Sequence, residues 1–471
     1  MKNLTLAWRN LWRNRRRTMI TVASVFFAVF FALIMRSLQL GSYDYMYKTA
    51  IESYSGYLQV QQKEWWDNKT VNNVFRYTDT LEKKLLQDPN VAGTVPRFES
   101  FALAAYGPTT KGVMVMGIDP VKENMLSKVA DKKVQYRLTP EAVEQIRSDA
   151  SLPKKTREIV EKFENVSFTS GSRFLTDLAL DPEKESDLLP KLAKYAKFEN
   201  GDIHSGEPGA WIGDRLSQYL EISIGDTLVL MGQGYHGTTA AGKYEVKGIV
   251  RQPAPDLDNK IVYLPVGIAQ QLYNAPGMLT SVALHLEETE DENIRETAAR
   301  LDDRIPGNTR MVDWKEMNEV MIQQMEADNI SGVFMLGILY LVIAFGIFGT
   351  VLMMTTERRR EFGVLVAIGM QKKKLAGVIT YEMMMIGLMG VAFGMIVCIP
   401  IILYGVNHPI IFKGEMAHMM EQYDFEPKLV FEPVNKYFLW QAFVVGIMIL
   451  VSLLNPLRKI MGLKVVNALR A

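Results

Sequence analysis

The sequence is divided by a charged stretch, ERRREFGVLVAIGMQKKKL at residues 357–375, which lies between two long apolar runs. Charged side chains enter hydrocarbon only at high cost, so this stretch is expected in water beside the lipid headgroups. Within it, Phe362, Leu365, Val366 and Ile368 recur at helical spacing, which predicts a short amphipathic helix along the membrane surface. A helix of this kind fits a groove on a soluble partner.

Four apolar runs are long enough to cross a bilayer, which takes roughly 20 residues. A signal peptide is the alternative for the first run, but that run exceeds a normal signal core and no small-x-small cleavage pattern follows it. We therefore predict four transmembrane helices. Their uncharged cores are Met19–Met35 (extendable to about Leu40), Asn329–Thr356, Met383–Asn407 and Tyr437–Leu457.

The positive charges predict the orientation, since Lys and Arg near span ends stay on the cytoplasmic side. Residues 1–18, the 357–375 stretch and the tail after Leu457 are all rich in Lys and Arg. The loop between the third and fourth spans is instead acidic. We expect a multi-pass protein of the cytoplasmic membrane with both termini in the cytoplasm and residues 41–328 outside it.

The segment 41–328 differs in charge from the rest of the chain. It carries a net charge of −11 against +12 elsewhere, which together give the overall +1 and argue against a nucleic-acid partner. It contains no cysteine, so it must be stable without disulfides, as its length allows. The single cysteine, Cys398, lies within the third span, where a packing role is expected.

Short alternating or apolar runs within 41–328 predict strands, and helical patterns separate them. The segment 121–200 is charge-rich and mostly helical in pattern, and we interpret it as an insertion. The predicted fold class is an α-helical membrane protein with four transmembrane helices and a large α+β extracytoplasmic domain between helices 1 and 2. Three regions follow: 1–40 with an amphipathic segment and the first span, 41–328 as the domain, and 329–471 with spans two to four, the 357–375 stretch and a cytoplasmic tail. The predicted strands are 57–61, 112–118, 227–231, 244–250, 260–264 and 281–286, and the predicted helices are 80–86, 266–273, 292–301 and 314–326.

A search for chemistry yields no catalytic centre and no metal site. Residues 237–244, GTTAAGKY, match a phosphate-binding loop except that Tyr244 replaces the Ser or Thr that must reach Mg²⁺. A strand follows instead of a helix, so a glycine-rich hairpin turn is the better interpretation. The five histidines show no zinc spacing. We expect no cofactor in this chain.

Small residues and one carboxylate stand out within the spans. Glycine lets helices approach closely, although it is also common in membrane helices for no special reason. Glu382, at the cytoplasmic entry of the third span, has three possible environments: the positive end of its own helix, a basic group on another helix, or the headgroup region. Leu4, Trp8, Leu11 and Trp12 are expected to face lipid. The candidate packing glycines are Gly346, Gly349, Gly387, Gly390 and Gly394.

Three stretches then show a resemblance to a known family. They are AWRNLWRNRRRT at 7–18, ERRREFGVLVAIG at 357–369, and NPLRKI at 455–460 with VNALR at 466–470. With the order of one span, a large domain and three spans, they resemble the FtsX-like, MacB-type (type VII) permeases of ABC transporters. That family includes the lipoprotein-releasing subunits.

The resemblance implies a mechanical role without enzymatic activity in this chain. Such permeases pair with a second copy or a paralogue, recruit cytoplasmic ATPase subunits that bind ATP and Mg²⁺, and convert ATP hydrolysis into motion of the periplasmic domain (mechanotransmission). Val366 and Met370 depart from the family pattern in the coupling helix. The residues that match this helix are Glu357, Arg358, Arg359, Arg360, Glu361, Phe362, Gly363, Leu365, Ala367, Ile368 and Gly369.

Two short motifs favour the lipoprotein-releasing (LolC/LolE-like) branch: SGYLQVQ at 55–61 and VMGIDP at 115–120. That branch implies lipoprotein cargo drawn from membrane lipids and a periplasmic carrier. Two alternatives are MacB-like efflux with an adaptor and outer-membrane channel, and FtsX-like signalling to a cell-wall hydrolase. The candidate carrier-binding loop is glycine-rich, short and without proline, which departs from that branch. Its residues are Gly232, Gly234, Tyr235, His236 and Gly237.

Overall fold

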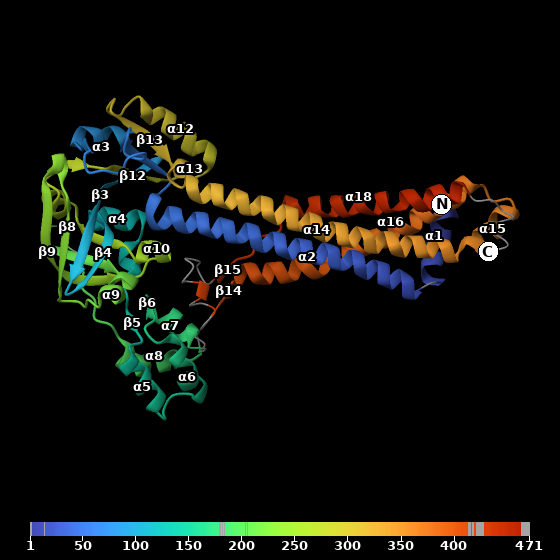
Figure 1. The fold of residues 1–471 in the computed structure, drawn as a ribbon, viewed down its shortest axis with the longest axis horizontal. Helices are drawn as coiled ribbons and strands as arrows, with labels where there is room; N and C mark the ends of the chain where they lie inside the picture. The colour runs from blue at the N-terminus through green and yellow to red at the C-terminus, as the bar shows by residue number, and fades with distance from the viewer. Residues whose placement is uncertain are drawn as a thin grey trace. The chain divides into compact units, whose positions relative to one another are not determined.

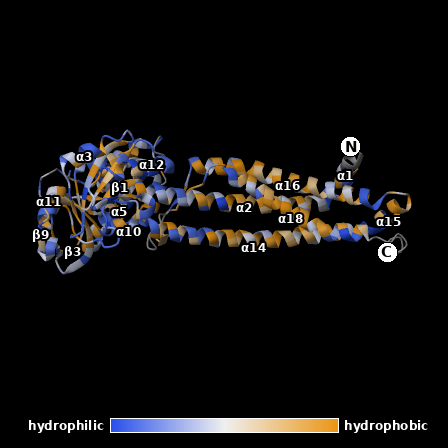
Figure 2. Cartoon of the chain, turned by 90° about the horizontal axis from the view of Figure 1, so that it is seen from above, coloured by the Kyte–Doolittle hydropathy of each residue, from blue (hydrophilic) through white to orange (hydrophobic). Residues whose placement is uncertain are grey.

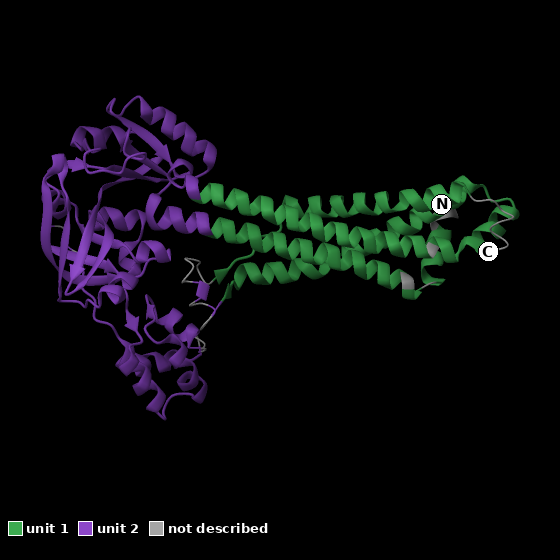
Figure 3. Cartoon of the chain, viewed as in Figure 1, with its two compact units in different colours: residues 1–45, 321–411, 428–471 green, residues 46–320, 412–427 purple. Residues whose placement is uncertain are grey.

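The protein is described here by a computed structural model. Contacts divide the chain into two compact units (Figures 1 and 3), a membrane unit and a folded unit that is mainly residues 46–320, and each is described by itself. The described residues are 2–13, 15–178, 180, 182, 184–202, 204, 206–412, 416, 419–420 and 428–462.

The membrane unit is built from long apolar helices. Among the described residues, four helices are long and apolar enough to cross a membrane, and Figure 2 shows hydrophobic residues along most of their lengths. The third begins at Lys372, so Lys372–Leu375, predicted as part of the loop, form its first turn instead. The helices of this unit are α1 (Lys2–Arg13), α2 (Arg15–Ala50), α14 (Glu319–Glu357), α15 (Arg359–Ala367), α16 (Lys372–Asn407) and α18 (Lys436–Met461).

Helix α16 is packed closely against α2 and α18 through three of the five candidate glycines. A Cβ on Gly390 would lie 2.5 Å from Cβ of Val25, and one on Gly394 would lie 2.9 Å from Cβ of Val29. A Cβ on Gly387 would lie 2.2 Å from Cδ1 of Ile449 in α18. These contacts have the close backbone approach that small residues permit.

The other two candidate glycines are placed differently. At Gly346 and Gly349 of α14, no heavy atom among the described residues lies within 4 Å of where a Cβ would stand. They therefore do not pack one helix against another within the described part of the chain. Helix α1 also differs from the sequence prediction: Trp8 and Trp12 are exposed, but Leu11 is buried against the other helices. The prediction that Leu11 faces lipid was wrong, because α1 packs on α16.

The folded unit is centred on a nine-stranded sheet in the order β13-β1-β12-β3-β4-β10-β7-β9-β8 (Figure 1). Strand β3 is long enough to pair along one edge first with β12 and then with β8. Six strands, β3, β4, β10, β7, β9 and β8, thus close on themselves, and β12, β1 and β13 extend the sheet. The strands are β1 (Leu58–Gln62), β3 (Val91–Tyr106), β4 (Thr109–Ile118), β7 (Gly209–Gly213), β8 (Thr227–Gln233), β9 (Thr239–Val250), β10 (Ile261–Pro265), β12 (Ser281–Leu286) and β13 (Thr309–Asp313).

All six predicted strands are present. In the 237–244 stretch, the first two residues complete a turn and the others begin β9. The sequence did not indicate β3, β7 or β13. The helix predicted over 314–326 is broken at Asn318, where α13 ends and α14 begins. The remaining helices around the sheet are the π-helical turn Ile51–Ser55, α3 (Asp79–Leu85), α4 (Pro120–Leu126), α9 (Asp214–Leu220), α10 (Pro255–Asp258), α11 (Val266–Leu272), α12 (Asp291–Asp302) and α13 (Trp314–Met317). Two short pairs among the described residues also belong to this unit: β2 (Phe75–Arg76) with β11 (Met278–Leu279), and β5 (Tyr136–Arg137) with β6 (Ser167–Phe168). A further pair, β14 (Ile410–Ile411) with β15 (Lys428–Leu429), belongs to the membrane unit.

Part of the 121–200 segment has a hydrophobic core of its own. That core contains Ile146, Phe168, Phe174 and Leu192. Helix α4 is not part of it, because α4 packs on β3 of the main sheet. The helices of this insertion are α5 (Pro140–Ser148), α6 (Lys154–Ile159), α7 (Gly171–Asp177) and α8 (Leu189–Ala196).

Candidate coupling site

Helix α15 is a separate nine-residue helix between the second and third spans. It ends at Ala367, and Gly369 follows with a φ of +106°, where Met370 N–H donates to Leu365 C=O at 3.0 Å and closes the last turn. A residue with a side chain is strained at that φ, so glycine is the residue that suits this helix end. The 357–375 stretch thus contains a short surface helix between two long ones.

Arg358 holds the start of α15 against the third span. Its guanidinium NH1 donates to both carboxylate oxygens of Glu382, at 3.0 and 2.9 Å. The side chain of Glu382 is 2% exposed and that of Arg358 is 14% exposed. The Arg358 guanidinium also lies 5.3 Å from the ring centroid of Phe362, which is buried. Of the three environments possible for Glu382, the structure shows the second: a basic group, Arg358, from outside its own helix.

A second ion pair brings the N-terminal helix to the same place. Arg13 NH2 of α1 lies 2.5 Å from Glu361 Oε2, and Arg358 Nε lies 3.3 Å from the same oxygen. Arg13, Arg358, Glu361 and Glu382 therefore join α1, α15 and α16 in one charged network. This network does not follow from the sequence alone. The sequence shows two arginines and two glutamates of opposite charge, but it does not show that they lie close together.

The outward face of α15 is apolar and basic. Ile368 is 80% exposed, and Val364 and Leu365 are exposed too, whereas Phe362 and Gly363 are buried. Arg359 and Arg360 are also exposed. A monomeric surface rarely leaves apolar side chains together on a short helix in water unless they contact something. Glu357 and Ala367 are exposed at the two ends of this segment.

The candidate carrier-binding loop is a tight turn that is bonded to the folded unit. Gly234 N–H donates to Thr238 C=O at 2.7 Å, and Tyr235 N–H donates to Tyr273 C=O at 2.8 Å. His236 N–H donates to the side chain of Asn72 at 2.9 Å. The glycines Gly232 and Gly237 lie at the end of β8 and in the turn. The loop therefore does not project as a free hook.

Comparison with known proteins bears on the membrane unit. The family model for the FtsX-like permease C-terminal region matches residues 333–463, which contain the described parts of α15, α16 and α18 and most of α14. Residues 333–463 thus resemble the C-terminal region of FtsX-like permeases. Three curated relatives, each 24% identical, are also permeases or transmembrane components. They are an uncharacterized ABC transporter permease protein of Mycobacterium tuberculosis (48% of this chain, 26% of the relative), the ABC transporter permease YtrF of Bacillus subtilis (54% and 54%), and the lipoprotein-releasing system transmembrane protein LolC of Xylella fastidiosa (42% and 50%).

The chain thus spans about a quarter to a half of the length of these relatives. Two solved structures align with this chain at low similarity. The extracellular domain of the noncanonic ABC-type transporter YknZ from Gram-positive bacteria covers 54% of the chain and 99% of its own, with 12% identity and a TM-score of 0.28. The periplasmic region of MacB from Actinobacillus actinomycetemcomitans covers 58% and 96%, with 7% identity and a TM-score of 0.30.

The membrane unit has an apolar groove. The groove has a volume of about 680 Å³ and lies between α1, α2 and α16. Its apolar lining includes Phe26, Phe27 and Phe393, and one basic residue, Arg15, also lines it. The groove is therefore suited to an apolar chain with a polar end.

A fully enclosed ion pair lies in the folded unit. Arg97 of β3 donates to Glu123 of α4 through Nε at 2.9 Å and NH2 at 2.6 Å, and also to the backbone C=O of Tyr54. Neither side chain is more than 1% exposed. Burial would raise the pKa of Glu123, but the Arg97 charge and hydrogen bonds outweigh it and lower that pKa below its usual value. The pair fixes the π-helical turn and α4 to β3.

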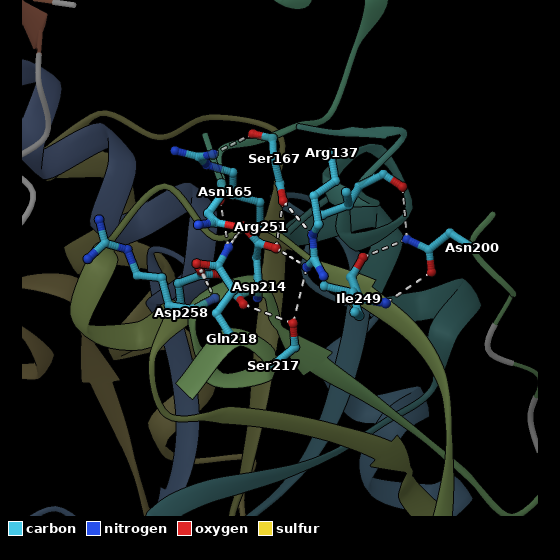
Figure 4. Close-up of polar contacts among 12 residues, drawn as sticks. Arg137, Asn165, Ser167, Asn200, Asp214, Ser217, Gln218, Ile249, Arg251 and Asp258 are labelled. Carbon is cyan, nitrogen blue, oxygen red and sulfur yellow. Dashed lines mark hydrogen bonds and ion pairs between the residues drawn. The ribbon is translucent and has the colours of Figure 1, made fainter. Parts of the chain in front are cut away.

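A second polar cluster joins the insertion to the sheet (Figure 4). Asp214, at the start of α9, accepts hydrogen bonds from Arg137 and from Ser167 Oγ, which belong to β5 and β6. Asn200 donates to Ile249 C=O at 2.6 Å and accepts from Ile249 N–H at 2.9 Å. These bonds connect both ends of the insertion to the main fold.

Asp258 lies beneath Asp214 in this cluster. Its carboxylate accepts backbone N–H bonds from Gln252 at 2.7 Å, Arg215 at 3.0 Å and Asp214 at 3.3 Å. Burial and the nearby Asp214 charge raise the pKa of Asp258 to about 7, although the N–H donors act in the opposite direction. The described residues contain no group of His, Cys, Asp and Glu arranged to hold a metal ion.

Proposed function

We propose that this chain is the permease subunit of an ABC transporter and that α15 is the helix through which a separate ATPase moves it. One observation supports this above others: the exposed apolar and basic face of α15, with Ile368 80% exposed on a short charged helix. The other face of α15 is held to α16 by Arg358 and Glu382. A push on the exposed face would therefore reach the third span through an ion pair and not through a loose loop.

In this proposal the partner ATPase subunits bind ATP and Mg²⁺, and two permease copies, or this chain and a paralogue, form the membrane part. The names of three curated relatives, as permeases of ABC transporters or a transmembrane protein of a releasing system, support the assignment. The charge difference between residues 41–328 and the rest supports a periplasmic position for the folded unit. ATP hydrolysis then drives motion of that unit.

We further propose that the cargo is a lipid-modified protein released from the inner membrane. The relative LolC is named for lipoprotein release, and the apolar groove near Phe27 and Phe393 has the size and lining for acyl chains. A periplasmic carrier would receive the cargo. The fixed turn at 234–238 makes a docking mode other than a protruding hook the simpler expectation for such a carrier.

The coupling proposal is tested by charge reversal on the exposed face. R359E/R360E leaves Arg358 and its bond to Glu382 in place, so the fold of the segment is preserved. We expect ATP hydrolysis by the co-purified ATPase to lose its dependence on the permease, together with loss of complex in gel filtration. K154E/K155E, an equal charge change at exposed positions of α6, is the matched control. Normal coupling in R359E/R360E would refute the assignment of α15.

The cargo proposal is tested separately, by mass spectrometry of proteins that co-purify with an ATPase-inactive complex. An N-terminally acylated protein whose retention falls when Phe27 is replaced by a charged residue would support lipoprotein release. A stable adaptor and outer-membrane channel would instead favour MacB-like efflux. A soluble hydrolase activated by the folded unit would favour FtsX-like signalling, and either result would overturn the lipoprotein proposal.

A further inference from the structure

A second pocket lies where the apolar stretches of two spans end. It has a volume of about 380 Å³ and is formed by the end of α14, the start of α15 and the end of α18. The uncharged stretch of α14 ends at Thr356, and that of α18 ends at Leu457. The pocket is therefore at the level of the lipid headgroups. Its lining residues are Thr355, Thr356, Arg359, Phe362, Lys459, Ile460 and Gly462.

The two charged residues that line this pocket are both positive. Arg359 and Lys459 line it, no carboxylate does, and neither cation forms an ion pair with any residue that the structure describes. The two threonines are donors whose hydroxyls bond to carbonyls of their own helix, for example Thr356 to Leu352 C=O at 2.7 Å. The buried side chains of Phe362 and Ile460 give the pocket an apolar floor.

The end of α18 would by itself repel an anion, because a helix C-terminus carries a partial negative charge. Lys372, at the start of α16, reduces that effect. Its Nζ donates to the C=O of Met461, one of the last carbonyls of α18, at 3.3 Å. The pocket thus has two unpaired cations at its wall and a third cation on the helix end behind it.

We propose that this pocket binds the phosphate-bearing headgroup of an anionic phospholipid from the adjacent leaflet. Basic pockets between transmembrane helices are suited to such headgroups. The apolar floor next to two cations matches a molecule that is anionic at one end and hydrocarbon at the other. An acidic side chain of the ATPase is less suited, because the exposed residues Leu365 and Ile368 of α15, which would contact that partner, do not line the pocket.

The test uses the purified full-length chain without any ATPase, so its result does not depend on the proposed coupling role. Binding is measured by native mass spectrometry after exchange into phosphatidylglycerol or phosphatidylcholine. We expect K459Q to lower the affinity for phosphatidylglycerol about five-fold and R359Q/K459Q to lower it further, with phosphatidylcholine unaffected. R458Q is the matched control, because Arg458 is exposed, carries the same charge and adjoins Lys459 but does not line the pocket.

Inorganic phosphate, added to the phosphatidylcholine sample, distinguishes a site for a lipid headgroup from a site for free phosphate. Stabilisation by millimolar phosphate that equals the effect of phosphatidylglycerol would show a free-phosphate site and overturn the lipid assignment. An equal loss in R458Q and K459Q would show only general attraction to a negative surface, which also overturns it. Cross-linking from K459C to the ATPase, with no loss of lipid in K459Q, would assign the pocket to that partner instead.

Discussion

Two arginine–glutamate pairs in this protein differ in how completely they are enclosed. Arg97 and Glu123, in the folded unit, are 0% and 1% exposed, whereas Arg358 and Glu382, in the membrane unit, are 14% and 2% exposed. The first pair is surrounded by sheet and helix. The second is continued outward by Glu361 and Arg13, which are half exposed. The enclosed pair is sealed from solvent, whereas the open pair shares Arg358 with a second carboxylate, Glu361, that faces solvent.

The largest effect is expected at the enclosed pair. R97M would leave the Glu123 carboxylate buried without a partner, which typically costs about 3–5 kcal/mol. The loss should appear as faster hydrogen exchange in β3 and α4 of the full-length chain, measured by mass spectrometry. The double variant R97M/E123L removes both charges and should recover most of the stability. Unchanged exchange in R97M would show that the pair does not fix these elements.

The same substitution at the open pair should cost less. In R358M, Glu382 loses its bidentate partner, but the network faces solvent on one side, so a cost of about 1–3 kcal/mol is expected. Hydrogen exchange should rise in α15 and in the first turns of α16. A cost equal to that of R97M would remove the distinction between the two pairs.

The pH dependence of the folded unit gives a third test. Because the pKa of Asp258 is raised to about 7, the folded state holds a proton that the unfolded state has already released above about pH 4. The resulting stabilisation is present at low pH and is lost as the pH rises through 7. Between pH 5 and 7.5 we expect protection of α9 and α10 to fall by about 1–2 kcal/mol.

D258N keeps this position neutral and should flatten that slope. Its absolute stability will also change, because an amide nitrogen cannot accept the backbone N–H bond, so the slope is the quantity to compare. A slope equal to that of the wild type would exclude Asp258 as the titrating group.

The smallest effect is expected at the outer edge of the open network. Arg13 and Glu361 are 61% and 50% exposed, and an exposed ion pair contributes at most about 1 kcal/mol. R13Q should therefore change the exchange of α1 only slightly, and less still at high salt. A loss as large as that in R358M would mean that α1 is held mainly by this bond and not by Leu11.

The sequence predicted the fold where one local pattern determines it. The four apolar helices and six strands follow from hydropathy and alternation, because each of those segments buries one face or all of it. Strand β3 was missed because its sequence alternates poorly: Arg97 and Glu99 are buried in it, and Phe101 and Leu103 are exposed. A buried polar residue has its partners far away in the sequence, and local spacing cannot show them.

The candidate site was predictable to a similar extent. The amphipathic character of α15 follows from its spacing, and its position between two spans follows from their length. The bond from Arg358 to Glu382 does not, since three environments were open to that carboxylate and only the packed bundle selects one. The placement of the glycines also depends on tertiary packing: Gly390 and Gly394 contact α2, while Gly346 and Gly349 of the neighbouring span meet no side chain among the described residues.

Strand β3 has one further consequence. Its first half pairs with β12 and its second half with β8, so the closed ring and the three outer strands share a single covalent backbone. A hinge between these two parts would require that backbone to bend within a hydrogen-bonded strand. A displacement of β1 or β13 should therefore be passed to β8 and β9 through this continuous hydrogen-bonded strand.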